Sequence, residues 1–221
     1  MTNETLTEIY ELLYEAFGPQ HWWPGETPFE VMTGAILTQN TSWTNVEKAI
    51  ANLKSAGRLS PEALHRIELS RLAELIRPAG YYNIKAKRLK NFLEWLFDSY
   101  DGNLAHLESV ATDRLREELL SVTGIGRETA DSILLYALGR PVFVVDAYTA
   151  RIAVRHGLIE PDADYEQLRE LFESNLQQDT KLFNEYHALL VRAGKEFCRP
   201  KARCLGCPLE KLPHTVDAEY P

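Results

Sequence analysis

The sequence has only three cysteines among 221 residues, and all of them fall between Cys198 and Cys207. Three clustered cysteines cannot form a disulfide framework that holds the whole chain. The sequence also has no apolar run long enough to cross a membrane, and its first residues, MTNETLTEIYELLYEAF, lack the basic start of a signal peptide. These absences favour a cytoplasmic protein with no membrane partner.

Basic residues are also in short supply. There are 24 lysines and arginines against 32 acidic residues, which gives a formal net charge of −8. Because proteins that bind nucleic acids are more often basic, this balance argues against such a partner. It does not exclude one, since the field at a binding face depends on the local distribution of charge. The length allows one domain or two small ones with a sizeable core.

The alternation of apolar and polar residues that is typical of strands is missing over any useful length. Residues 142–145 form the only β-branched run. Thr27-Pro28, Ser60 and Ser70 have the composition of helix starts. The expected fold class is therefore all-α. Apolar residues recur every three or four positions and predict helices over 3–17, 46–53, 61–67, 70–76, 86–97, 165–176 and 182–197.

The stretch 119–156 organises the rest of the chain. Two apolar segments with helical spacing flank Gly124-Ile125-Gly126, a pattern that predicts a helix-hairpin-helix. The two glycines allow backbone conformations that are closed to other residues, and they let another backbone approach closely. Such a turn points backbone N–H groups outward at the start of a helix, where they bind anions such as a DNA phosphate. The second helix is expected to end near Gly139, before Pro141.

A single acid, Asp146, follows the apolar segment after the hairpin. This order of motifs resembles the helix-hairpin-helix DNA glycosylase superfamily and its endonuclease III-like members, from Thr27 to Cys207. The resemblance implies that Asp146 is the catalytic carboxylate. It also implies two helical domains, a six-helix barrel-like domain over 28–139 that holds the hairpin, and a second domain made from 1–27 and 140–221.

Glu128 stands where the bifunctional endonuclease III enzymes carry a nucleophilic lysine. The resemblance therefore implies a monofunctional glycosylase without lyase activity. Glu128, the Trp22-Trp23-Pro24 loop and the LTQNT segment resemble most the 3-methyladenine DNA glycosylase III branch. Alkylation gives a purine a positive charge, so the base leaves without a protein acid, and one carboxylate can stabilise oxocarbenium character at the sugar. Aromatic faces such as those of Trp22, Trp23 and Trp43 would favour the cationic base.

The resemblance also implies which residues meet damaged double-stranded DNA, bound by a monomer. Gln39 occupies the place of a glutamine that, in the family, fills the gap left in the duplex by the flipped nucleotide. Without the resemblance, this loop would be interpreted as a polar connection between two helices. Each of these residues also has a purely structural interpretation. The two loop tryptophans can fill a junction between domains, and His187 can be a core residue. The basic run near Lys85 can be a solvent-exposed face. The expected base pocket contains Trp22, Trp23, Pro24, Trp43, Glu128 and Lys195, and the expected DNA contacts are Gln39, Lys85, Gly124, Ile125, Gly126 and Arg127.

The cysteines follow the pattern Cys198-x5-Cys204-x2-Cys207. This resembles the C-terminal iron–sulfur loop of endonuclease III-like enzymes, whose clusters take four thiolates. A fourth cysteine is missing, and Pro213 and His214 stand near its place. A [4Fe-4S] cluster with three cysteines and His214, a zinc site and a loop without metal all remain open.

Two other functions also remain open. One is a glycosylase for mismatched or oxidised bases. The other is a DNA-binding protein that uses the hairpin only as a phosphate clamp. Asp146 argues against the clamp, because a carboxylate near DNA would oppose binding.

Overall fold

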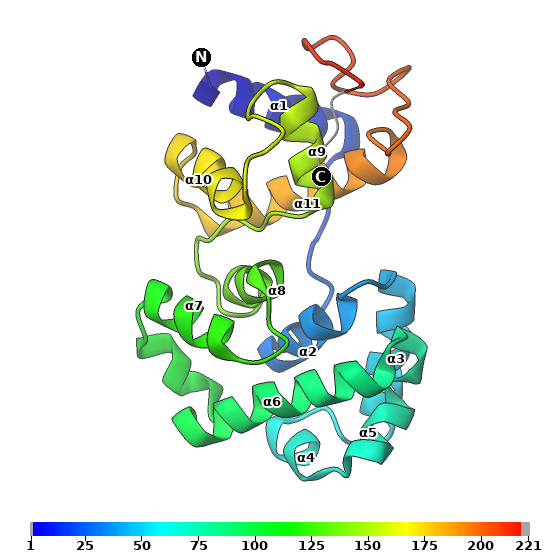
Figure 1. The fold of residues 1–221 in the computed structure, drawn as a ribbon, viewed down its shortest axis with the longest axis vertical. Coiled ribbons are helices and arrows are strands. Elements are labelled where there is room, and N and C mark those ends of the chain that lie inside the picture. The colour runs from blue at the N-terminus through cyan, green and yellow to red at the C-terminus, as the bar shows by residue number, and fades with distance from the viewer. Residues whose placement is uncertain (1, 218–221) are drawn as a thin grey trace. The chain divides into compact units, whose positions relative to one another are not determined.

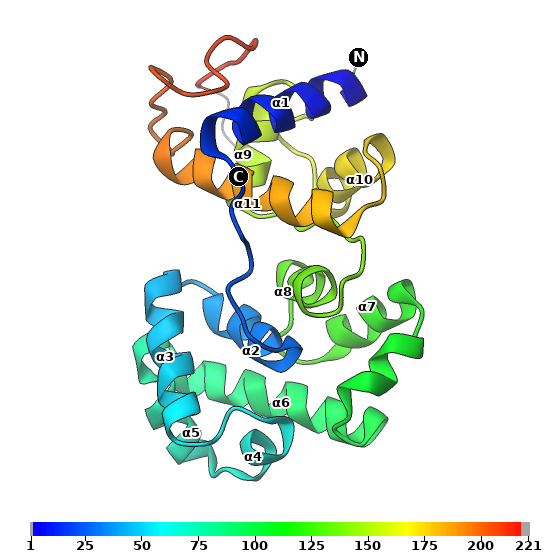
Figure 2. The ribbon, with the colours of Figure 1, turned by 180° about the vertical axis from the view of Figure 1, so that it is seen from behind.

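The computed structural model describes residues 2–217, and within them the chain is helical with no strand (Figures 1 and 2). The expected all-α fold class is confirmed. The chain divides into two units, Met1–Trp23 with Pro141–Pro221, and Pro24–Arg140. The boundaries expected from the sequence were 28 and 139, and the ends of the expected terminal domain, residues 1 and 218–221, lie outside the described part. None of the described helices is long and apolar enough to span a membrane.

The unit Pro24–Arg140 is built around α2, whose residues from Phe29 to Leu37 are all buried. A helix that is apolar on every side needs neighbours on every side. It contacts α3, α6, α8 and η3, and α6 lies between α2 and the pair α4 and α5 (Figures 1 and 2). The elements are α2 (Pro28–Thr38), α3 (Trp43–Ser55), α4 (Pro61–Arg66), α5 (Leu69–Leu75), η1 (Arg77–Ala79), α6 (Tyr82–Tyr100), η2 (Leu104–Ser109), α7 (Thr112–Ser121), α8 (Arg127–Ser132) and η3 (Ile133–Ala137).

Two of the three predicted helix starts are confirmed. The hydroxyl of Thr27 accepts the N–H of Glu30 at the start of α2, and Ser60 caps α4 in the same way. The predicted helix start at Ser70 was wrong, because α5 begins at Leu69 with Glu68 as its N-cap residue. The second helix of the hairpin also differs from the expectation, because after Ser132 it continues as a π-helix, η3. Such π segments are rare and often accompany functional sites.

The other unit is built on α11 (Thr180–Glu196), against which α1 (Thr2–Phe17) and α9 (Ala147–Arg155) pack. Its core contains an aromatic cluster in which Phe143 stacks on Phe172 at 4.0 Å between ring centroids. Phe183 and Tyr186 meet Phe143 edge-on. Residues 142–145 are a buried segment outside any helix that leads into α9, and α10 (Tyr165–Asn175) completes the unit.

Candidate active site and DNA-binding elements

Asp146 is the N-cap residue of α9. Its Oδ1 accepts the backbone N–H groups of Tyr148 at 2.9 Å and of Thr149 at 2.8 Å. Capping satisfies N–H groups that a helix start otherwise leaves without partners, and Asp is among the residues preferred there. The two bonds fix the orientation of the carboxylate. They also leave Oδ2 to face another group.

That other group is His187 of α11, whose Nε2 lies 3.7 Å from Asp146 Oδ2. Burial alone would raise the pKa of the Asp146 carboxyl, but the neighbouring His187 imidazole, with the N–H of Thr149, lowers that pKa below its usual range. Asp146 is therefore an anion at neutral pH. His187 is buried, as expected for a core residue, but it also faces the candidate catalytic acid. Its position in an apolar helix gave no signal of that contact.

Close packing of α9 on α11 holds Asp146 and His187 in this arrangement. At Gly194 of α11, an added Cβ would lie 2.4 Å from Cδ1 and 2.6 Å from Cβ of Tyr148. The second of these atoms cannot move away without its backbone. Gly194 therefore sets how closely the two helices approach.

Trp22, Trp23 and Lys195 lie together in the same unit. The two tryptophan rings meet edge-on at 5.4 Å between centroids, and Lys195 Nζ lies 5.9 Å from the centroid of Trp22. The side chain of Lys195 is exposed, so its ammonium reaches solvent. Three of the six expected base-pocket residues are thus neighbours.

Two more of them, Pro24 and Trp43, line one cavity of about 160 Å³ in the other unit. The cavity also contains Glu30, which is buried and lies 2.9 Å from Lys54 Nζ, and the exposed Glu47. An aromatic face beside carboxylates is suited to a cationic ring. The sixth residue, Glu128, is exposed on the first turn of α8.

The two hairpin glycines differ in their roles. Gly124 has φ +100°, and an added Cβ would lie 2.4 Å from Cγ of Arg88, so this position requires glycine. Gly126 has φ −94° and open space around it, so the expectation of an unusual backbone conformation was wrong there. Ile125 is buried and its N–H is bound by the carbonyl of Val122 at 3.0 Å, so it anchors the turn. Arg127 is exposed at the start of α8.

Gln39 is bound to the hairpin. Its Nε2 donates to the carbonyl of Gly124 at 3.0 Å and to Oγ1 of Thr129 at 2.9 Å, and its Oε1 accepts from Arg88. Both ends of the amide are therefore occupied. In this structure Gln39 joins the end of α2 to the hairpin and does not project from the loop.

Lys85 is buried with 1% of its surface exposed, so the expectation that it contacts a phosphate was wrong for this conformation. Its Nζ donates to the carbonyls of Leu37 at 2.9 Å and Ala79 at 2.7 Å. Burial, together with the charge of Arg88, lowers the pKa of Lys85 to about 8. A basic residue within a charged segment gave no sign that it was the one turned inward.

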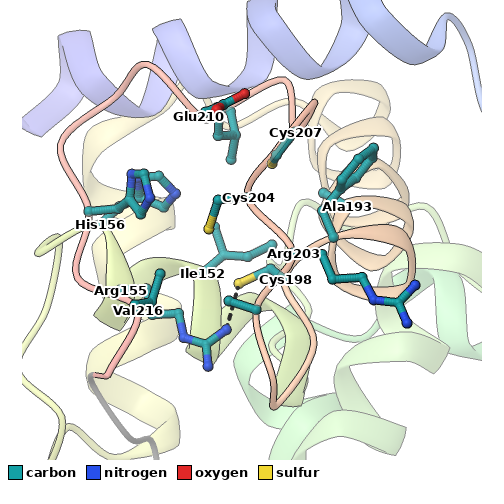
Figure 3. Close-up of a pocket in the computed structure, with 14 residues that line it drawn as sticks. Ile152, Arg155, His156, Ala193, Cys198, Arg203, Cys204, Cys207, Glu210 and Val216 are labelled. Atoms are coloured by element: carbon teal, nitrogen blue, oxygen red, sulfur yellow. Dashed lines mark hydrogen bonds between the residues drawn. The ribbon is translucent and has the colours of Figure 1, made fainter.

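The three cysteines line a second cavity, of about 30 Å³ (Figure 3). His156, at the end of α9, and His214 line it as well, with their rings 5.5 Å apart between centroids. His156 Nδ1 lies 3.0 Å from the carbonyl of Pro213, and His214 Nδ1 lies 2.8 Å from that of Leu212. A carbonyl on one ring nitrogen is the usual arrangement of a metal-binding histidine. His156 is the member of this group that its sequence position did not reveal.

The Cys198 sulfur also has a cationic neighbour, because Nη1 of the buried Arg155 lies 3.3 Å from it (Figure 3). Within residues 2–217, however, no three cysteine, histidine or acidic side chains converge closely enough to hold a metal ion. A zinc site and a loop without metal therefore stay predictions. An iron–sulfur cluster stays a prediction.

Comparison with known proteins identifies the family. Residues 33–178 match the sequence profile of the HhH-GPD superfamily of base excision DNA repair proteins, so the chain belongs to this superfamily. A proposed DNA repair glycosylase of Methanocaldococcus jannaschii is 51% identical over 211 residues, which are 95% of this chain and 96% of that protein. Endonuclease III of Thermotoga maritima is 31% identical, over 79% of this chain and 76% of its own.

Solved structures agree with this assignment. The H. pylori 3-methyladenine DNA glycosylase MagIII, bound to 1,N6-ethenoadenine, has a TM-score of 0.75 and 32% identity over 88% of this chain and 97% of its own. An endonuclease III–DNA complex has a TM-score of 0.81 at 23% identity, over 96% and 95% of the two chains, and shows the shared fold. The chain is a base excision repair DNA glycosylase of the HhH-GPD family.

Proposed function

We propose that this glycosylase is monofunctional and releases alkylated purines of the 3-methyladenine type from double-stranded DNA. The observation that carries the proposal is the Asp146 carboxylate, which is oriented by two N–H groups and kept ionised beside His187. A fixed anion of this kind can stabilise positive charge that develops at the sugar and can orient a water molecule. It cannot protonate a leaving base at neutral pH.

An ionised Asp146 therefore suits a base that needs no protonation. Alkylation at N3 or N7 makes the purine cationic before the bond breaks, so the leaving group is already activated. The cavity beside Trp43 combines an indole with the exposed carboxylate of Glu47, whereas Glu30 in the same cavity is already paired with Lys54. The indole and Glu47 favour a cation over the neutral base. MagIII, a structural relative, is a 3-methyladenine DNA glycosylase crystallised with a modified adenine.

The absence of lyase activity rests on position 128. A Schiff base needs an amine, and α8 presents the carboxylate of Glu128 where a lyase would carry its lysine. Borohydride should then trap no covalent protein–DNA adduct on duplexes with a damaged base. A trapped adduct that disappears in Lys195→Ala would assign the amine to Lys195 and refute the monofunctional reaction.

The substrate is tested by release of bases from methylated DNA. Wild-type protein should release 3-methyladenine, and Asp146→Asn should lower kcat/KM by about 10²–10³ while DNA affinity stays equal or increases. A loss smaller than about tenfold, ~1.4 kcal/mol, would contradict the role of Asp146. Duplexes with a mismatched thymine or an oxidised base, used in parallel, separate this substrate from the alternative one.

A further inference from the structure

Two neighbouring helices, α9 and α10, both begin with an aspartate at the N-cap, but they differ at the third helical position, N3. In α10 the side chain of Gln167 at N3 accepts the N–H of Asp164 at 2.9 Å, and the two residues form a complete capping box on the surface. In α9 the residue at N3 is Thr149, three positions after Asp146. The cap of the candidate catalytic acid is therefore built differently from that of an ordinary surface helix in the same unit.

The hydroxyl of Thr149 is buried beside the Asp146 carboxylate. Thr149 is 0% exposed, and its N–H lies 2.8 Å from Oδ1 of Asp146. Side chains of a helix lean toward its N-terminus, which directs this one back toward the cap. Among the described residues, no group meets Oγ1 in the geometry of a full hydrogen bond. A buried hydroxyl without such a bond is costly, and valine would fill the same space without that cost. This cost points to a use for the hydroxyl other than stability.

Few groups act on the charge of Asp146. The hydroxyl of Thr149 is near enough to lower the pKa of the carboxyl, as His187 of α11 does. From α10, the hydroxyl of Tyr165 lies 3.4 Å from the backbone nitrogen of Val145, one residue before Asp146. The charged residues of α9, and those of α11 after Lys181, are directed elsewhere; they are Arg151, Arg155, Glu185, Arg192, Lys195 and Glu196. The side chain of Asp146 is 13% exposed, so one part of it stays open to a substrate.

We propose that Thr149 is a positioning residue for the glycosylase reaction, whose buried hydroxyl donates to the Asp146 carboxylate and fixes its orientation as positive charge develops at the sugar. A hydrogen bond that is incomplete in the free protein can tighten in the complex with substrate. Electrostatic stabilisation requires a charge that is already oriented when the transition state forms, so a carboxylate free to turn would contribute less. This inference rests on the proposed role of Asp146 as the acting anion.

The test compares Thr149→Val, which keeps the shape of the side chain but lacks the hydroxyl, with Thr149→Ser, which keeps the hydroxyl. Thr149→Val should lower kcat for base release by about tenfold at an unchanged KM, because the lost interaction is made only in the transition state. Thr149→Ser should keep most of the wild-type kcat. The free energy of unfolding of Thr149→Val should not fall, since this variant removes a buried hydroxyl that lacks a full hydrogen bond.

A second measurement requires no base release. The carboxyl of Asp146 is titrated by carbon NMR, with its signal assigned from Asp146→Asn. The pKa of Asp146 should rise in Thr149→Val, which loses a group that lowers it, and should return toward the wild-type value in Thr149→Ser. If the titrations behave in this way but wild-type protein releases no alkylated base, the substrate assignment fails and the action of Thr149 on Asp146 is supported.

Two results would overturn the proposal. One is a Thr149→Val protein with the kcat and the Asp146 titration of wild type. The other is an equal loss in Thr149→Val and Thr149→Ser, which would assign the effect to packing. Thr149→Ala replaces Thr149→Val if the latter does not fold, because alanine and serine differ only by the hydroxyl.

Gln167→Ala is the control for helix capping. It removes a complete cap bond from α10, so it should lower the free energy of unfolding while kcat stays unchanged. A fall in kcat as large as that of Thr149→Val would show that activity follows the capping of any helix in this unit, and would contradict a specific role of Thr149.

Discussion

The carboxylate of Asp146 has its two oxygens in different environments. Oδ1 caps α9, and Oδ2 faces the imidazole of His187 at 3.7 Å. The cap stabilises the start of α9 whether or not the protein is an enzyme. The contact with His187 stabilises the ionised carboxylate, because it opposes the effect of burial on the pKa of Asp146.

Replacing His187 should therefore move the acid side of the pH profile. In His187→Leu the burial of Asp146 remains but the favourable contact with the imidazole is gone, so the pKa of Asp146 rises. Since the ionised form is the active one, kcat/KM should begin to fall at a higher pH than in wild type as the solution is acidified. The measurement is the pH dependence of 3-methyladenine release. His187→Gln, which keeps a donor without the charge, should give a smaller displacement, and identical acid limbs in all three proteins would contradict the coupling.

Residue identity alone could indicate Asp146, because one acid follows an apolar segment after a hairpin. It could not indicate the direction of each basic side chain. Lys85 and Lys87 stand two residues apart in the same charged run, yet one is buried between two carbonyls and the other is exposed. Only the packing of α6 against α2 decides between them.

The hairpin shows what a sequence pattern says about an element and what it omits. The two glycines and the flanking apolar runs predict the turn. They do not distinguish Gly124, which has φ +100° and touches Arg88, from Gly126, which has neither constraint. The π-helix that follows Ser132 has no signal in apolar spacing either, because one wide turn barely changes the periodicity.

The two glycines should therefore respond differently to the same substitution. Gly124→Ala introduces a positive-φ alanine and a contact at 2.4 Å with Arg88 Cγ, and should lower the free energy of unfolding by about 1–3 kcal/mol. Gly126→Ala should leave it within about 0.5 kcal/mol, as substitutions away from such features usually do. Urea denaturation of both variants measures this. Equal destabilisation would show that the turn tolerates no side chain at either position.

At the scale of the whole molecule, the net charge of −8 opposes the approach of DNA. Binding must therefore depend on a few local cations, of which Arg127 at the hairpin is the first candidate. We expect the affinity for duplex DNA to fall steeply with salt, and Arg127→Ala to lower the slope of log affinity against log salt by about 1. Arg71→Ala, which removes an exposed charge that is paired with Glu74 within α5, away from the hairpin, should leave the slope unchanged. Affinity that barely depends on salt would show that the hairpin engages no phosphate.

The cysteine loop of this chain differs from the iron–sulfur loop that the resemblance to endonuclease III-like enzymes implies. Three thiols line one cavity, the fourth is missing, and two imidazoles stand beside them with one ring nitrogen of each at a backbone carbonyl. A cluster bound here would have a histidine in place of one thiolate, as in Rieske centres. It would stabilise the fold of the loop, and the glycosylase reaction would proceed without it.

We therefore expect protein purified without oxygen to be brown and to absorb at about 400 nm, as cysteine-ligated clusters do. The two histidines must be tested separately and together, because His156 lies in the same cavity as His214 and can replace it. His214→Ala with His156→Ala should remove the colour and the iron, whereas Cys198→Ser serves as the positive control for loss. Iron analysis and the absorption spectrum are the measurements. Colourless, iron-free wild-type protein would show that the loop is held by its own contacts, chiefly those of Arg155 to the carbonyls of Arg199 and Pro200.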